Sequence, residues 1–171
     1  MTRLHGLLRA FKSIWRRPQC LLVALALTQP VVAAEPLSFR ADSLAAIEAR
    51  HAGRPFILSL WSVNWCGHCI AELSMLGRLA KSEKRLPLVL VATDAPEFSN
   101  AIESTLQRLG LADKESWVFD DDIPERLRHA IDASWRGEVP RTYLYDARHR
   151  RETVSGLLDE SALIAWLKRQ P

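Results

Sequence analysis

From residue 35 onward, two kinds of hydrophobic pattern alternate along the chain. Continuous apolar runs of strand length at 56–61 and 87–92 predict strands that are buried on both faces. Elsewhere apolar residues recur at helical spacing, as at Ile70, Leu73 and Leu76. In chain order we expect a short leading segment at 35–40, a helix capped by Asp42-Ser43, a strand at 56–61, a helix from 66–69 to about residue 84, a strand at 87–92, a helix from Pro96 to Gly110, a strand at 117–119, a helix from Pro124 through Ile131, a strand at 141–146, its hairpin partner at 151–155, and a last helix from Asp159 or Ser161 through Leu167.

This order of elements predicts a single α/β domain. A β-α-β unit comes first and is followed by strand, strand and helix, which suggests a central sheet covered by helices on both faces. We find no internal repeat and no linker-like stretch after residue 35.

The first 34 residues have the pattern of a secretory signal peptide. Residues 1–17 hold five basic side chains and no acid, and the apolar run 20–27 ends at a break near Pro30. Small residues follow, and we expect cleavage after Ala34. The alternative is an uncleaved membrane anchor, but the apolar run is shorter than the roughly 20 residues that a spanning helix needs.

Cleavage there changes the composition of the protein. The whole chain of 171 residues has 23 Lys+Arg against 20 Asp+Glu, a net charge of +3. Removing 1–34 takes away five basic residues, which leaves 18 against 20 and a net charge of −2. The basic excess therefore belongs to the targeting segment, and nothing else favours nucleic-acid binding. We expect 35–171 to form one domain in the periplasm or another exported compartment, with membrane contact only if the segment stays uncleaved.

Cleavage also removes Cys20, so only Cys66 and Cys69 remain. They lie three apart where a buried strand gives way to a helix. The partial positive charge and unpaired N–H groups of a helix N-terminus lower the pKa of the first cysteine and stabilise its thiolate. We therefore predict Cys66 as the nucleophile and Cys69 as the resolving thiol. His68 between them adds to the effect, because an imidazolium favours the thiolate further.

Two other uses of the pair are weaker. A structural disulfide that closes so short a loop gains little loop-closure entropy. A metal site could use Cys66, His68 and Cys69, but no second cluster supplies obvious ligands. Dithiol exchange is favoured, and it requires neither a cofactor nor a metal.

Two motifs resemble a known family. The segment Trp65-Cys66-Gly67-His68-Cys69, the nearby Glu72, and the segment 138–146 (EVPRTYLYD) together resemble the exported TlpA/ResA-like thiol-disulfide oxidoreductases of the thioredoxin superfamily. The likeness runs from about Phe56 to Leu167. It implies a thioredoxin-like fold with a central mixed sheet and helices on both faces.

The resemblance also implies roles for residues outside the cysteine pair. It predicts a cis peptide bond before Pro140, which would face the cysteines. Val139 would then offer its backbone to an extended substrate, much as in strand addition. Trp65 and Gly67 would contact the same substrate from the rim of the site.

Two of the chain's departures from the family bear on its chemistry. Leu60 stands where many thioredoxins carry a buried acid, so proton transfer from Cys69 would use Glu138, Glu72 or water. The alternative is that both glutamates are ordinary solvated surface charges. The Gly67-His68 dipeptide is that of protein disulfide isomerase, whereas many reducing members of the family have a proline before the second cysteine.

We therefore expect an exported thiol-disulfide oxidoreductase, with a TlpA-like disulfide reductase favoured. An oxidase or isomerase is the first alternative, and a metal-binding chaperone that uses Cys66, His68 and Cys69 is the second. The expected partners are protein thiols or disulfides and a membrane redox partner, with the domain acting as a monomer. The sequence leaves open the substrate and the direction of electron flow.

Overall fold

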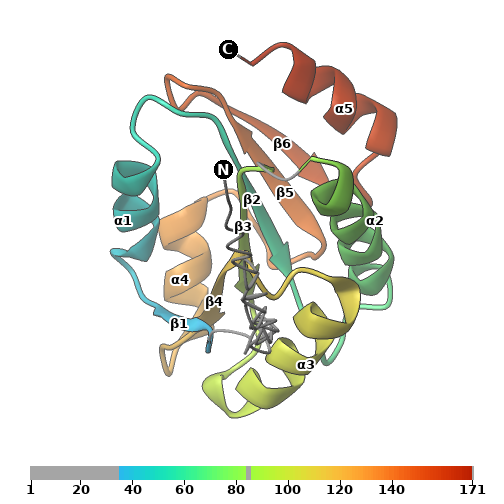
Figure 1. Ribbon diagram of the computed structural model, residues 1–171. Helices are drawn as coiled ribbons and strands as arrows, with labels where there is room; N and C mark the ends of the chain where they lie inside the picture. The colour runs from blue at the N-terminus through green and yellow to red at the C-terminus, as the bar shows by residue number, and fades with distance from the viewer. Residues whose placement is uncertain (1–34, 84–85, 171) are drawn as a thin grey trace, which may run out of the picture. The chain divides into compact units, whose positions relative to one another are not determined.

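The computed structural model describes residues 35–83 and 86–170, and the predicted signal segment lies outside these residues. Every predicted helix and strand within the described range is present (Figure 1). The strands are β1 (Leu37–Phe39), β2 (Phe56–Trp61), β3 (Leu88–Ala92), β4 (Glu115–Phe119), β5 (Arg141–Tyr145) and β6 (Arg151–Ser155). The helices are α1 (Ser43–Arg50), α2 (Cys69–Ser82), the 3-10 turn η1 (Pro96–Phe98), α3 (Ser99–Leu109), α4 (Pro124–Ile131) and α5 (Glu160–Lys168).

The strands form one mixed sheet in the order β1-β4-β3-β2-β5-β6. The first four strands of that order are parallel, whereas β5 runs antiparallel to β2 and forms a hairpin with β6. Leu60 near the end of β2 pairs with Arg141 at the start of β5. The segment that leaves β2 and the segment that enters β5 therefore lie at the same end of the sheet.

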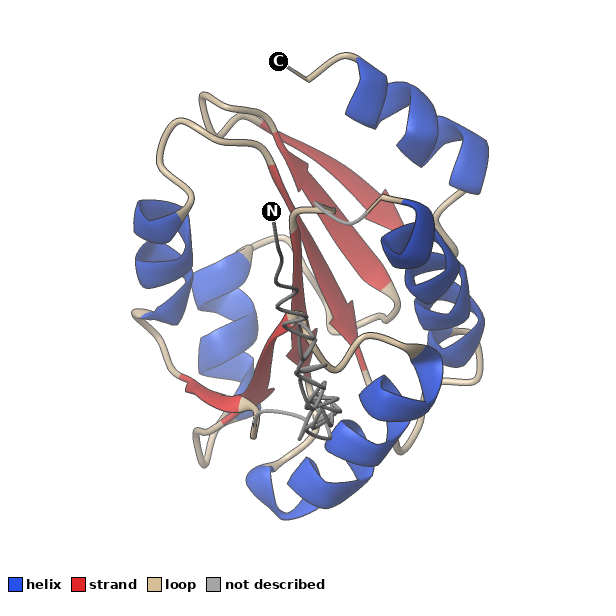
Figure 2. Ribbon diagram, viewed as in Figure 1, coloured by secondary structure: helices blue, strands red, loops and turns tan. Residues whose placement is uncertain are grey.

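Helices cover both faces of the sheet, as predicted (Figure 2). We call the apolar cluster that contains side chains of α2, α3 and α5 the first core, and the cluster that contains side chains of α1 and α4 the second core. Ile57 and Trp61 of β2 belong to the first core, while Phe56, Leu58 and Leu60 belong to the second. Because successive strand residues point to opposite faces, this two-sided burial explains the unbroken apolar run of β2.

Glycines shape two places in the packing around α3. A Cβ atom at Gly77 of α2 would come within 2.1 Å of the backbone oxygen of Leu109, so only glycine permits this close approach of α2 and α3. Gly110 ends α3 in the left-handed conformation, with φ 74°. The predicted stop of this helix is thereby confirmed.

The leading segment is the main correction to the predicted elements. Residues 37–39 form the edge strand β1, in which Leu37 pairs with Trp117 and Phe39 with Phe119. The Phe39 ring is fully buried and stacks on that of Phe119 with centroids 5.5 Å apart. Three residues are too few to show a strand periodicity, so packing on β4 decides this element. No helix in the described ranges is long and apolar enough to cross a membrane.

Candidate functional site

The two cysteines lie where the central strand gives way to a helix. Residues 62–68, which we call the cysteine loop, connect β2 to α2, and Cys69 is the first residue of that helix. Cys66 and Cys69 form a disulfide, with their Cα atoms 5.4 Å apart. Cys69 is fully buried, Cys66 is half-buried, and Gly67 and His68 are exposed. Attack from solvent can therefore reach Cys66 more readily than Cys69.

The helix N-terminus is directed at the first cysteine. The backbone N–H of Cys69 donates a hydrogen bond to Cys66 Sγ over 3.0 Å. This N–H is one of the groups that an α-helix leaves without an internal partner. In the reduced protein the same donor and the helix dipole would stabilise a thiolate on Cys66.

A buried carboxylate holds the cysteine loop, and sequence reasoning missed it. Asp94 follows β3 and is 5% exposed. Its carboxylate accepts hydrogen bonds from the Ser62 hydroxyl over 2.7 Å and from the backbone N–H groups of Val63 and Asn64 over 2.9 and 3.3 Å. The Ser62 hydroxyl oxygen in turn accepts from the N–H of Trp65 over 3.2 Å. Three successive backbone donors before Cys66 are thus fixed, and the signal for this was a polar residue at the carboxyl end of a buried strand.

The predicted proline segment lies at the same end of the sheet. We call residues 132–140, between α4 and β5, the proline loop. The peptide bond between Val139 and Pro140 is cis, as the resemblance implies. Val139 is half-buried and packs against both cores. Among the described residues, the N–H and C=O groups of Val139 have no hydrogen-bond partner. Trp65 is 54% exposed, which confirms that its side chain faces solvent.

Glu72 is a buried carboxylate, so its interpretation as a solvated surface charge is wrong. Its side chain is only 2% exposed, and its Oε1 atom accepts from the hydroxyls of Ser59 and Thr142 over 3.1 and 2.9 Å. Its Oε2 atom accepts from the N–H of Leu158 over 3.0 Å. Burial raises the pKa of Glu72, although these three hydrogen bonds oppose the shift.

The helical spacing brings Glu72 to the side of the cysteine pair. Glu72 lies three residues after Cys69 in α2, and residues three apart share one face of a helix. Glu72 does not replace the buried acid of many thioredoxins in position, because that position is Leu60, which is fully buried in the apolar second core. The first core, which contains Cys69, is therefore the side of the sheet that Glu72 enters.

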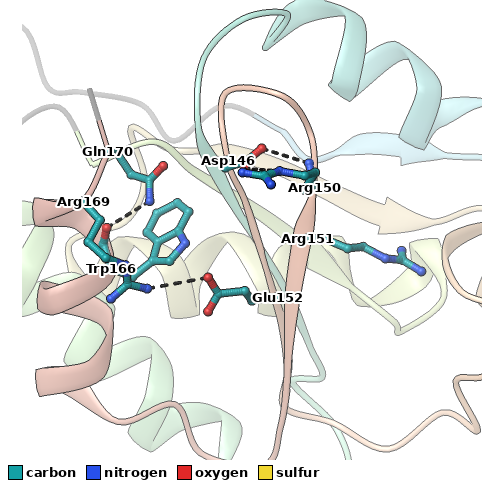
Figure 3. Close-up of a pocket in the computed structure, with 7 residues that line it drawn as sticks. All are labelled: Asp146, Arg150, Arg151, Glu152, Trp166, Arg169 and Gln170. Atoms are coloured by element: carbon teal, nitrogen blue, oxygen red, sulfur yellow. Dashed lines mark hydrogen bonds and ion pairs between the residues drawn. The ribbon is translucent and has the colours of Figure 1, made fainter.

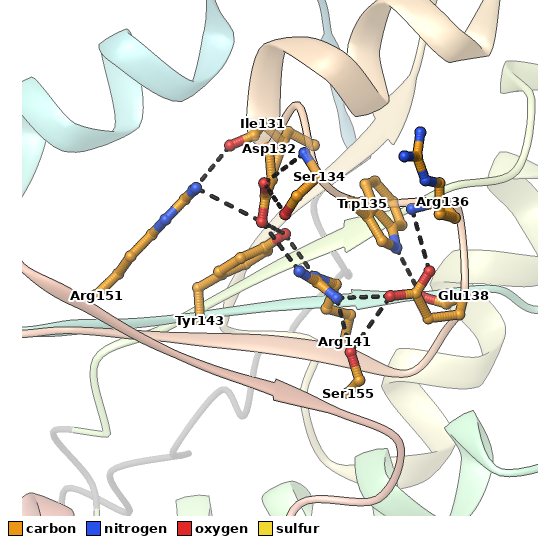
Figure 4. Close-up of polar contacts among 10 residues, drawn as sticks. All are labelled: Ile131, Asp132, Ser134, Trp135, Arg136, Glu138, Arg141, Tyr143, Arg151 and Ser155. Atoms are coloured by element: carbon orange, nitrogen blue, oxygen red, sulfur yellow. Dashed lines mark hydrogen bonds and ion pairs between the residues drawn. The ribbon is translucent and has the colours of Figure 1, made fainter.

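Glu138 belongs to a separate group of polar side chains (Figure 4). Its Oε1 atom accepts a hydrogen bond of 2.6 Å from Arg141 Nη1, and its Oε2 atom accepts from the N–H of Arg136. Arg141 also contacts Asp132 Oδ2, over 3.0 Å. Figure 4 shows the Arg141 guanidinium between these two carboxylates.

Asp132 is the second carboxylate that sequence reasoning missed. Burial opposes its ionisation, but hydrogen bonds from Ser134, Arg141 and Tyr143 outweigh that effect and hold the pKa of Asp132 well below its ordinary value of 3.8. It is therefore charged at neutral pH and compensates the buried Arg141. Nothing in the local sequence marks this partnership, because the residues are brought together by the proline loop.

A cleft at the opposite end of the sheet holds charges that neutralise one another (Figure 3). It measures about 420 Å³ and lies between the β5–β6 hairpin and α5. Arg150 pairs with Asp146 over 2.7 Å, and Arg169 lies 3.6 Å from Glu152. Because Tyr145 at this end of β5 pairs with Phe56 at the start of β2, the cleft is remote from the cysteines. Within the described ranges, no group of three or more His, Cys, Asp or Glu side chains is placed to hold a metal ion.

Comparisons with known proteins identify the fold. No family model and no curated protein matches this chain. Among solved structures, a secreted Mycobacterium tuberculosis disulfide oxidoreductase homologous to E. coli DsbE is similar with a TM-score of 0.55 and 20% identity, over 70% of this chain and 84% of the other. A thiol:disulfide interchange protein of the thioredoxin family from Chlorobium tepidum TLS gives 0.54 and 18%, over 71% and 82%. A DsbF homologue from Corynebacterium diphtheriae gives 0.54 and 18%, over 71% and 74%. The predicted thioredoxin-like fold is thereby confirmed.

Proposed function

We propose that this protein is an exported thiol-disulfide oxidoreductase that exchanges disulfides with protein substrates. The observation that carries the proposal is the Cys66–Cys69 disulfide at the N-terminus of α2, with the Cys69 N–H directed at the more accessible sulfur. The similar solved structures include disulfide oxidoreductases, which supports the same chemistry. The pattern of residues 1–34 supports export, to the periplasm or an equivalent compartment.

In the first step the Cys66 thiolate attacks a disulfide of the substrate. A mixed disulfide forms between Cys66 and one substrate sulfur, and the other substrate sulfur leaves as a thiolate. The helix N-terminus favours the attacking thiolate. Val139 holds the substrate by backbone pairing, and Trp65, Gly67 and His68 form the exposed rim around it.

In the second step Cys69 releases the product. Its thiolate attacks Cys66 Sγ, the Cys66–Cys69 disulfide forms, and the second substrate sulfur leaves as a thiolate, which takes up a proton from water. Two electrons have then passed from the enzyme to the substrate. We assign the proton that Cys69 loses to Glu72, because its raised pKa suits proton exchange and it lies on the Cys69 face of α2. Glu138 is engaged with Arg141 and is not assigned this role.

The direction that we propose is reduction of the substrate. Two buried carboxylates adjoin the segments that carry the cysteines: Asp94 bonds to the backbone of the cysteine loop, and Glu72 follows Cys69 by three residues in α2. Negative charge there disfavours a thiolate. A less stable dithiol gives up electrons more readily. A membrane redox partner then reduces the Cys66–Cys69 disulfide again, and the domain works as a monomer.

Two measurements test this proposal. A Cys69→Ser variant should accumulate mixed disulfides with substrates in the native compartment, while the matched Cys66→Ser variant should trap none; the reverse pattern would contradict the assigned roles. Equilibration with glutathione should give a reduction potential near that of thioredoxin, about −270 mV. A value near that of protein disulfide isomerase, about −180 mV, would exclude the reductase direction.

A further inference from the structure

Arg141 is a buried charge immediately next to the segment that would bind substrate. It follows Pro140 in the chain and is only 8% exposed. Its guanidinium donates to Tyr143 Oη over 2.7 Å, Glu138 Oε1 over 2.6 Å, Ser155 Oγ over 2.7 Å and Asp132 Oδ2 over 3.0 Å. An arginine rarely occupies such a site unless its charge and donors are paired, and here both conditions are met.

These bonds connect two different parts of the protein. Asp132 and Glu138 belong to the proline loop, whereas Tyr143 and Ser155 belong to the β5–β6 hairpin (Figure 4). Arg141 therefore bridges the loop to the sheet on either side of Val139.

The carboxylates of Asp132 and Glu138, which bind Arg141, also accept hydrogen bonds from the loop backbone. Asp132 Oδ1 accepts from the N–H of Ser134 over 2.9 Å, and Glu138 Oε2 accepts from the N–H of Arg136 over 3.2 Å. The indole N–H of Trp135 donates to the backbone oxygen of Glu138 over 2.8 Å. The loop is thus fixed on both sides of its tip, up to the residue before Val139.

Stability alone does not explain a charge at this position. Replacing a buried ion pair by well-packed apolar residues is often neutral or stabilising, because desolvation offsets the Coulomb attraction. A guanidinium instead provides donors in a rigid planar fork, which fixes the orientation of its partners. The property that an apolar side chain would lack is orientation of the proline loop.

We propose that Arg141 is a positioning residue that holds the unpaired N–H and C=O of Val139 in place for extended polypeptide substrates. This inference rests on the proposed function and adds the residue that keeps its substrate-binding segment in position. An extended chain can use both backbone groups of Val139, as an added strand would, whereas a small disulfide without amide groups cannot. Arg141 therefore controls reaction with polypeptide disulfides and leaves reaction with small disulfides unaffected.

The test compares two disulfides that share one leaving group. Reduced protein is mixed with thionitrobenzoate disulfide-bonded either to the central cysteine of a linear peptide or to 2-mercaptoethanol, and release of the coloured thiolate gives the rate. In Arg141→Met we expect the peptide rate to fall about tenfold or more, because small misplacement of a binding group is costly. The rate with the mercaptoethanol disulfide should stay within about twofold of wild type.

Further variants keep the test decisive if Arg141→Met folds poorly. Arg141→Lys keeps the charge but cannot reach four partners at once, so it should show an intermediate, peptide-specific loss. Glu138→Gln should also slow only the peptide, whereas a proton-transfer role for Glu138 would slow both reactions. Arg150→Gln, on the same hairpin at the other end of the sheet, should change neither rate.

Each outcome has a distinct meaning. Equal slowing of both disulfides, or no slowing of either, in Arg141→Met and Arg141→Lys would overturn the positioning role. Failure of the wild-type protein to react with either disulfide would refute the proposed function itself.

Discussion

The cysteine loop and the proline loop lie at the same end of the sheet, but they are held in different ways. In the cysteine loop, one carboxylate, Asp94, accepts hydrogen bonds from backbone N–H groups and from Ser62. In the proline loop, the guanidinium of Arg141 connects side chains that come from the loop and from two strands. One anchor acts on the main chain, and the other acts mainly through side chains.

This difference has a physical consequence for the two loops. Backbone N–H groups are present whatever the side chains are, so the hydrogen bonds that anchor residues 63–65 require only the side chains of Asp94 and Ser62. The anchoring of the proline loop depends on balanced buried charges, and the loss of any one partner leaves another uncompensated. We therefore expect substitutions that remove a charge, and protonation at low pH, to destabilise the protein mainly through the proline loop.

The largest expected effect on stability is that of Asp94→Ala. The substitution leaves the Ser62 hydroxyl and the Val63 N–H without their acceptor, and each lost partner of a buried group costs about 1–3 kcal/mol. We expect the free energy of unfolding of the oxidised protein to fall by about 3 kcal/mol, as measured by urea denaturation. Asp94→Asn keeps one acceptor oxygen, so its free energy of unfolding should fall clearly less than that of Asp94→Ala. Equal losses in the two variants would mean that the acceptor atoms do not hold this loop.

Next in size is Asp132→Asn, which removes one of the two charges that compensate Arg141. We expect a loss of about 2 kcal/mol at neutral pH, because Glu138 still pairs with the guanidinium. The folded-state pKa of Asp132 is depressed, so its contribution is complete above its ordinary value of 3.8 and is lost as the pH falls below that value.

The pH dependence provides the control for this prediction. Urea denaturation from neutral pH down to about pH 3 should show a steeper acid loss in wild type than in Asp132→Asn. Asp113→Asn, at a carboxylate whose side chain is 66% exposed, should retain the wild-type slope. If the unfolding free energy of Asp132→Asn depended on pH as steeply as that of wild type, charge pairing would not be what holds the proline loop.

Glu72→Gln should lower the free energy of unfolding less than Asp132→Asn does, and its effect should depend on pH in the opposite direction. The folded-state pKa of Glu72 is raised, so the folded protein loses stability as the pH rises from its ordinary value of 4.5 through the raised value. The variant should be about 1 kcal/mol less stable near pH 4, where one hydrogen bond is lost, and the gap should narrow toward neutral pH. A gap that widens with pH, measured by urea denaturation of the oxidised protein, would contradict the assigned shift.

The smallest expected effect is that of Arg150→Gln, which sets the baseline for charges on the hairpin. The Arg150 side chain is 75% exposed, and exposed ion pairs contribute about 0–1 kcal/mol. We expect thermal or urea unfolding to change by less than about 0.5 kcal/mol. A larger loss of stability in Arg150→Gln would contradict the expectation that exposed arginines on this hairpin contribute less than the buried Arg141.

The sequence predicted most of the fold because burial and backbone constraints leave local patterns. Strands β2 and β3 appear as unbroken apolar runs because both of their faces are covered. The sequence predicts a helix from Pro96 to Gly110, and the structure has the 3-10 turn η1 at Pro96 followed by α3, which ends at Gly110. Both signals act within a few residues. Strand β1 leaves no such pattern, since its three residues depend on contacts with β4.

The candidate site also has features that the local sequence predicts and features that depend on tertiary contacts. The spacing of Cys66 and Cys69 before a helix determines their chemistry locally, and the spacing of Glu72 from Cys69 already places it on one helical face. Its burial could not be predicted, because Ser59, Thr142 and Leu158, which bond its carboxylate, come from elements up to 86 residues away.

The order of the elements and the dithiol at the start of a helix can be predicted from the sequence, because both depend on neighbours in the chain. The contacts of Asp94 with the cysteine loop, and of Asp132 and Glu138 with Arg141, arise only in the folded protein. A buried charge must find its partners wherever the fold brings them, and no local pattern encodes a contact that chain topology creates.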